Sequence, residues 1–345
     1  MKSLKDYSLN LSEKDYHALD AWSYSLIARY AREGFGAIAN LHVPVEPNDA
    51  MKFGSLFDCM LTRSEDVANE FVIGTKVPPA EKAVLDALAQ ISSAKNYLEV
   101  TDGELLNAIT IAGYQQRWKF ETQKDHIDTY SEYYNIIRSG KTVVTEDDWS
   151  DAAEMVRIVK TDEYLSQHFN VSSTDKKEFI YQAQFKIDYM ASKGMIELKI
   201  MPDMLEVDHE NKTIQPWDIK TSGMPGFDWF EHFVKMRYDL QAQLYTDVLF
   251  FFIQKTPEYK DYKILPYLFM DISRTDKVPV TYTYNPTSDS QCNGLCFESN
   301  GRVVTYKNYR QLLDEILEYE STMTKVPKYI TTSGPNDLIE LLSRK

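Results

Sequence analysis

Two aspartates and a lysine lie close together near the middle of the chain, in a stretch that could hold a divalent cation. The stretch is 196–222, and it contains Asp203, Asp218 and Lys220. Apolar and β-branched residues dominate both of its ends, while 208–212 is polar and typical of a tight turn. The pattern predicts two antiparallel strands joined by this turn.

The expected register brings the two aspartates together. A turn centred at 210–211 pairs Val207 with Ile214. The same register places Asp203 opposite Asp218, and side chains that face each other across strands have Cβ atoms about 4.5–5.5 Å apart. Because side chains alternate along a strand, Lys220 shares the face of Asp218.

This arrangement suits phosphodiester chemistry. Two neighbouring carboxylates repel each other unless a cation lies between them, and Mg²⁺ prefers hard oxygen ligands of this kind. A bound metal polarises a phosphodiester and lowers the pKa of water, and a nearby ammonium can orient that water or stabilise the developing charge. The alternative interpretation is a solvated hairpin that carries the three charges, because short acid-x-Lys strings are common.

The same residues resemble the motif of the PD-(D/E)xK nuclease superfamily, and within it the phage RecE-type and RecB-like exonucleases. Pro202, Asp203, Asp218 and Lys220 match the motif that names the superfamily. The resemblance implies an α/β fold with a restriction-endonuclease-like core, in which helices flank a mixed central sheet.

Two further segments extend the resemblance to about 23–247. Gln241 and Tyr245 match the Gln-x-x-x-Tyr helix of these enzymes. Gly54 and Asp58 match their Gly-x-x-x-His helix, with Asp58 in place of the usual His. Asp is a competent oxygen ligand for Mg²⁺, so Asp58 is either an extra metal ligand or an acid paired with a base on a closely packed helix.

The resemblance implies a role for each site residue. Asp203, Asp218 and the Ile219 carbonyl would bind Mg²⁺, for which Mn²⁺ would substitute. Lys220 would orient or help to deprotonate the attacking water. The helical pair Gln241 and Tyr245 would position the DNA strand.

The implied activity is a metal-dependent exonuclease that digests duplex ends from 5′ to 3′ in recombination or repair. Partners implied by the resemblance are DNA, a single-strand annealing protein and further copies of the chain in a homo-oligomer. A phage origin fits the same resemblance. We expect the protein to lie in the cytoplasm.

Composition bounds these expectations. The chain has 345 residues, 43% of them hydrophobic, so an ample core can form. Three cysteines do not indicate a disulfide framework, and no apolar stretch reaches the about 20 residues of a membrane span. The net charge of −14 opposes broad DNA binding, unless basic side chains gather in one channel.

Two regions are expected from the patterning along the chain: a helical N-terminal region over 1–170 and the nuclease core over 171–345, packed as one compact structure. Helices are predicted over 12–33, 49–61, 78–94, 102–120, 132–139, 145–168, 227–254, 306–319 and from 335. Strands are predicted over 177–190, 264–273 and 278–284, 285–301 is expected to be a loop, and 35–170 an all-helical cap.

A third strand should border the acidic pair. A turn at 192–193 places Gln182 opposite Asp203, where RecE-like enzymes tend to have Glu. Asp58 or Glu178 would compensate for this missing carboxylate.

Two rival functions remain open. A RecB-like nuclease that cuts single strands, or an endonuclease, would use the same site. A catalytically silent module that binds DNA or protein would keep the fold alone.

Overall fold

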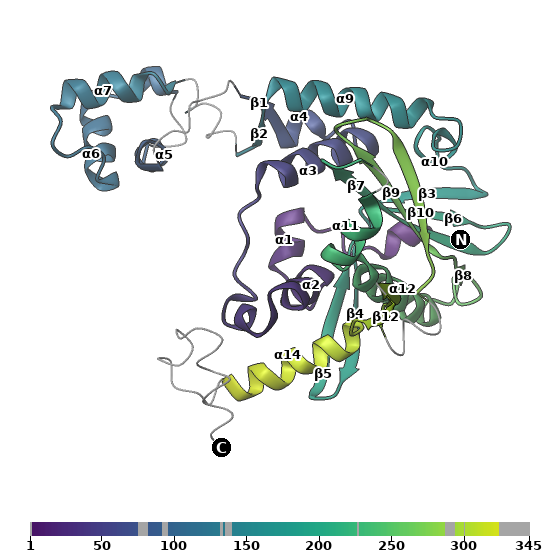
Figure 1. The fold of residues 1–345 in the computed structure, drawn as a ribbon. Coiled ribbons are helices and arrows are strands. Elements are labelled where there is room, and N and C mark those ends of the chain that lie inside the picture. The colour runs from purple at the N-terminus through teal and green to yellow at the C-terminus, as the bar shows by residue number, and fades with distance from the viewer. Residues whose placement is uncertain are drawn as a thin grey trace. The chain divides into compact units, whose positions relative to one another are not determined.

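The computed structural model describes residues 2–74, 82–91, 96–131, 134, 140–225, 228–286, 294–299 and 301–323. It shows a mixed α/β protein with a six-stranded central sheet flanked by helices (Figure 1). The sheet has the order β10-β9-β7-β6-β3, with β8 also paired to β7. The strands are β3 (Lys177–Tyr181), β6 (Met204–Asp208), β7 (Thr213–Ser222), β8 (Lys263–Ile264), β9 (Tyr267–Ser273) and β10 (Pro279–Tyr284).

The chain divides into two compact units, one over 1–46 and 158–345 and one over 47–157. The first 46 residues therefore belong with the sheet rather than with a separate helical region. The second unit contains α3 (Asp49–Thr62), α4 (Val67–Glu70), α5 (Lys82–Ala89), α6 (Asp102–Ala112), α7 (Phe120–Asp128) and the start of α9 (Glu146–Thr161).

The prediction of an all-helical cap over 35–170 was wrong. β1 (Phe71–Ile73) and β2 (Thr142–Val144) form a parallel pair in the second unit. Both strands have only three residues, too few to show an alternating pattern in the sequence. The predicted helix at 132–139 lies almost wholly outside the described residues.

The predicted helix at 12–33 is interrupted. α1 (Glu13–Ala18) begins at the Ser12 cap and α2 (Tyr24–Glu33) ends at Gly34, as expected. Between them the chain bends at 19–21, and Trp22 forms a bridge with Leu198 through its backbone. This tertiary pairing outweighs the helical pattern of the sequence.

The predicted strand at 177–190 is broken in the middle. β3 pairs with β6 and β4 (Phe185–Ala191) pairs with β5 (Gly194–Ile200), both in the register set by a turn at 192–193. Gln182 lies between the two parts with a φ of 53°, and its N–H donates to the Asp203 carbonyl at 3.1 Å. A residue with positive φ cannot continue a strand, so the hairpin divides between two sheets while its register persists.

β7 and β9 run parallel, and two helices connect them. These are α11 (Trp229–Met236) and α12 (Tyr238–Lys255), in place of the single predicted helix at 227–254. Arg237 separates them in the left-handed conformation, with a φ of 62°. Its buried guanidinium donates two hydrogen bonds to Asp239, at 2.9 and 3.0 Å, so it supports the junction and is not free to contact a phosphate.

The end of the described chain adds a hairpin and a helix. β11 (Cys296–Ser299) pairs with β12 (Arg302–Thr305) where we predicted a loop, and α14 (Tyr309–Met323) follows. The helix predicted from 335 lies outside the described residues. Among the described helices, none is long and apolar enough to cross a membrane.

A buried lysine anchors α1 to the β4–β5 hairpin. Lys199 is 4% exposed, and its ammonium donates to the carbonyls of Tyr16, His17 and Leu19 at 2.8, 3.2 and 2.9 Å. Burial lowers the pKa of Lys199. The ammonium adds a charged donor to three carbonyls at and just beyond the end of α1, where donors from the helix itself run out.

We expect Lys199→Met to lower the free energy of unfolding by at least about 2 kcal/mol, because three buried carbonyls lose their charged donor. Urea denaturation followed by circular dichroism measures this. The matched control is Lys186→Met, since Lys186 lies directly opposite Lys199 but its side chain is 30% exposed. Equal losses in the two variants would contradict the anchoring role.

Candidate active site

The register of β6 and β7 brings the two predicted aspartates together. Val207 pairs with Ile214 and Met204 with Trp217, so Asp203, just before β6, is opposite Asp218. Opposite Ile219 there is no longer a β6 residue to pair with, because β6 begins only at Met204. The Ile219 N–H instead donates to the Asp203 carboxylate at 2.7 Å. The Asp203 carboxyl is also close enough to Asp218 to act on its pKa.

Asp218 lies at the centre of this cluster and is 1% exposed. Its Oδ2 is 2.6 Å from the Lys220 ammonium, and its Oδ1 accepts a hydrogen bond from the Gln241 side-chain amide. Burial raises the pKa of Asp218 even though Lys220 and Gln241 oppose the shift. The carboxylate is therefore incompletely neutralised by the protein alone.

Lys220 is held as an ammonium. Burial alone would lower its pKa, but the facing Asp218 carboxylate outweighs burial and the pKa lies well above its usual value. The ammonium also lies 4.9 Å from the centre of the Tyr238 ring, within cation–π range. A protonated lysine can orient the attacking water or stabilise developing charge. It is less suited to the other predicted role, which is to deprotonate the water.

α12 supplies the predicted Gln241 and Tyr245, which are four residues apart and therefore share a face. Gln241 is buried and contacts Asp218 directly. Burial, followed by the Asp218 charge, raises the pKa of Tyr245, and the nearby Met201 backbone opposes the shift. Gln241 therefore orients the central carboxylate, and Tyr245 lies within the electrostatic reach of Asp218.

Sequence reasoning missed a group of tyrosines around the acidic pair. The Asp218 charge acts on the hydroxyls of Tyr24, Tyr238 and Tyr267. The Tyr267 hydroxyl is fully buried and has no hydrogen-bond partner among the described residues. The signal in the sequence is only the abundance of 23 tyrosines, which does not say which of them share a site.

A third buried carboxylate, Asp271, was also missed. β9 pairs with β7 so that Asp271 is directly beside Lys220. Its Oδ2 accepts from the Ser222 hydroxyl at 3.1 Å, and burial raises its pKa to about 6. An acid inside the apolar run 267–272 is the sequence signal that could have identified it.

The donor set at the acidic pair fits a divalent cation. Two carboxyls this close repel each other unless a proton or a cation lies between them. In a strand, the N–H and C=O of one residue face the same neighbour, so the Ile219 carbonyl faces the side of Asp203. Among the described residues there is no cluster of three or more His, Cys, Asp or Glu side chains suited to a metal, so backbone and water oxygens would complete the ligands.

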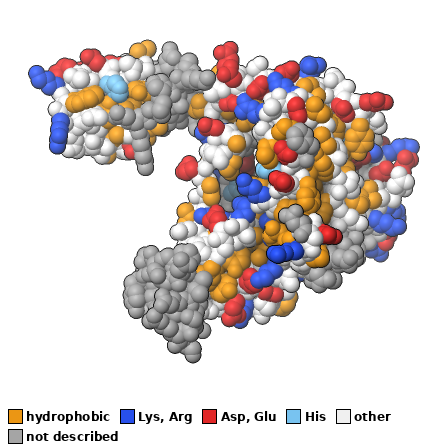
Figure 2. All heavy atoms as spheres, in the orientation of Figure 1, with side chains coloured by type: hydrophobic (Ala, Val, Ile, Leu, Met, Phe, Trp, Pro, Cys, Tyr) orange, Lys and Arg blue, Asp and Glu red, His pale blue; other side chains and the backbone are white. Residues whose placement is uncertain are grey.

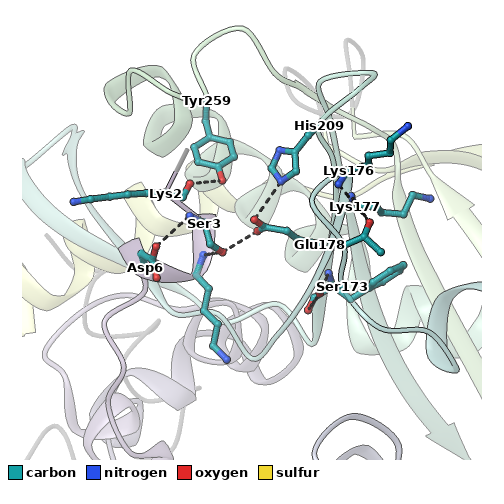
Figure 3. A network of polar contacts seen from close by, with 12 residues as sticks. Lys2, Ser3, Asp6, Ser173, Lys176, Lys177, Glu178, His209 and Tyr259 are labelled. Carbon is teal, nitrogen blue, oxygen red and sulfur yellow. Dashed lines mark hydrogen bonds and ion pairs between the residues drawn. The ribbon is translucent and has the colours of Figure 1, made fainter.

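The predicted extra ligands lie in other surroundings. Asp58 is on α3 in the second unit, where its charge acts on Arg63 and on the Cys59 thiol, and its role as a metal ligand stays a prediction. Figure 3 shows Glu178 in a separate network, in which it accepts from Ser3 at 2.8 Å and contacts His209 at 3.2 Å. Glu178 is therefore already engaged away from the acidic pair.

Charges of both signs mix on the visible surface. Figure 2 shows Lys and Arg side chains interspersed with Asp and Glu across the described part of this face, without one broad basic area. This distribution agrees with the net charge of −14. A nucleic acid held here would depend on local contacts near the site.

Comparison with known proteins leaves the family open. No protein-family model matches the chain, and no curated protein matches it. Among solved structures 13 chains match. One of them, described as "Crystal structure of SSO0001", is 13% identical over 56% of this chain and 70% of its own, with a TM-score of 0.28. At this TM-score the likeness carries no argument about fold or function.

We expect Asp271→Asn to stabilise the metal-free protein in a pH-dependent way. The folded state raises the pKa of Asp271 to about 6, so this acid contributes favourably below the unfolded pKa near 4, and the contribution is lost as pH rises through 6. Removing the charge should change little at pH 4 and add up to about 3 kcal/mol at pH 7.

Urea unfolding in EDTA across this pH range measures the difference between the two proteins. A matched control is Asp276→Asn, because Asp276 is a nearby but exposed acid. A difference between wild type and Asp271→Asn that does not vary with pH would contradict the prediction.

Proposed function

We propose that the protein is a Mg²⁺-dependent DNA exonuclease with a restriction-endonuclease-like core, which hydrolyses phosphodiesters at duplex ends in recombination or repair. The observation that supports it is the register that sets Asp203 opposite Asp218, with Lys220 2.6 Å from Asp218. A repulsive pair of acids in the centre of a sheet costs stability, so a function is the simplest reason for it.

Each residue of the proposed site has its own role in the reaction. Asp203, Asp218 and the Ile219 carbonyl would hold Mg²⁺ or Mn²⁺, which supplies Lewis-acid polarisation of the phosphodiester when bound. The Lys220 ammonium stabilises the negative charge that develops on the phosphoryl oxygens and orients the attacking water. Gln241 fixes the orientation of Asp218.

Tyr245 completes the strand side of the proposed site. Its ring is half of an edge-to-face pair with Tyr267, at 6.2 Å between ring centres, which fixes its position. Through the resemblance, the proposed partners are DNA, an annealing protein and further copies of the chain, in the cytoplasm.

A silent binding module is the second candidate. The mixed surface charge favours it, and so does the lack, among the described residues, of three His, Cys, Asp or Glu side chains grouped to hold a metal. The same site in a RecB-like single-strand nuclease or an endonuclease would differ only in how DNA reaches it.

The first test compares linear and circular duplex DNA. Wild type with Mg²⁺ should degrade linear DNA alone, and Lys220→Ala should lower the rate at least about 100-fold, the usual size for loss of one charge-stabilising group. Gel electrophoresis over time measures both rates. Lys212→Ala is the control, since Lys212 is an exposed lysine on the adjacent turn.

Cleavage of circles would move the activity to an endonuclease, and preference for single strands to the RecB-like alternative. No cleavage by pure wild-type protein, with either metal, would contradict the nuclease.

The second test concerns metal binding itself. We expect Mn²⁺ to bind the wild type, and Asp203→Ala to weaken its affinity at least about 10-fold because one of the few charged ligands is lost. Isothermal titration calorimetry measures this without any cleavage. A wild type that binds no Mn²⁺, or binds it equally well without Asp203, would favour the silent module.

A further inference from the structure

Asp271 is a buried carboxylate that the proposed reaction leaves without a role. It is 2% exposed, and its Oδ1 has no hydrogen-bond partner among the described residues. Buried polar atoms are almost always paired. An orphaned carboxylate oxygen inside a candidate active site is therefore a place that can accept a further donor or cation.

The position of Asp271 identifies this donor. In the parallel ladder Asp271 is beside Lys220, and neighbouring residues of paired strands project to the same face. The charges of Asp271 and Lys220 act on each other and on the Tyr238 ring. Lys220 thus has an acid on each side along this face. Asp218 contacts it, and Asp271 forms no ion pair with any of the residues that the structure describes.

A divalent cation would change the balance between these two acids. Lys220 uses Asp218 Oδ2 at 2.6 Å, an atom that a metal at the Asp203–Asp218 pair would need. Two positive charges at one carboxylate repel each other, and the repulsion is strong in a buried site. Because the Lys220 side chain is four carbons long and flexible, its ammonium can move while the backbone stays in place.

We propose that Asp271 is a positioning residue that receives the Lys220 ammonium from Asp218 when a divalent cation occupies the Asp203–Asp218 pair. The inference rests on the proposed metal site and specifies which carboxylate pairs with Lys220 when the metal is bound. Without metal, the Lys220 ammonium pairs with Asp218. With metal bound, it would pair with Asp271 and leave Asp218 to the ion.

A double-mutant cycle on Mn²⁺ affinity tests the transfer in the full chain. Asp271→Asn, which keeps the shape and the Ser222 contact, should weaken Mn²⁺ binding about 10-fold or more, as loss of a partner around a metal site does. In a Lys220→Met background the same substitution should have little effect, because no ammonium remains to compete. Calorimetry measures all four affinities, with Asp276→Asn as the control for a nearby exposed acid.

Lys220→Gln serves as a second background, since it keeps a hydrogen-bond donor for Asp218 if the Met variant does not fold. An equal loss of affinity from Asp271→Asn with and without Lys220, or no loss at all, would overturn the transfer. A wild type that binds no Mn²⁺ would overturn it as well.

The proposed nuclease activity is tested separately, by DNA digestion with the wild type. An intact cycle without cleavage contradicts the nuclease alone, and cleavage with equal affinities in wild type and Asp271→Asn contradicts the transfer alone.

Discussion

Burial of the Asp218 carboxylate is the constraint on which the rest of the site depends. At 1% exposure it cannot be solvated, so each neighbour must offset its charge. Lys220 comes from the same strand, Gln241 from the helix packed over it, and the Ile219 N–H holds the adjacent Asp203 where β6 begins. Two strands and one helix therefore meet at this one carboxylate.

A second buried acid shows what full compensation looks like. Glu206 on β6 is 2.6 Å from His168 and 2.5 Å from Lys177. Burial would raise its pKa, but the two partners outweigh burial and the pKa is lowered. The pKa of Asp218 moves in the opposite direction although it too has a lysine. This contrast separates an acid whose charge its neighbours offset in full from one whose charge they offset only in part.

Local chemistry explains which parts could be predicted from sequence. The turn fixes the β6–β7 register, and hence Asp203 opposite Asp218, because hairpin pairing depends on nearby residues. Helical spacing likewise groups Gln241 with Tyr245. Asp271 and the tyrosines depend on the parallel pairing of β7 with β9, which no periodicity encodes. The breaks at Gln182 and Arg237 were missed because both are non-glycine residues with positive φ, which propensity does not anticipate.

The parallel β7–β9 pair also bears on how the protein reaches its native state. Strands that pair in parallel must wait for the whole crossover of α11 and α12, and contacts between distant residues slow folding. The acids of the hairpin can meet early, before Asp271 or Gln241 arrives. Until the crossover docks, the hairpin carries both carboxylates with only Lys220 and solvent to offset their charge, so the closing of the sheet is also the step that buries the acidic pair.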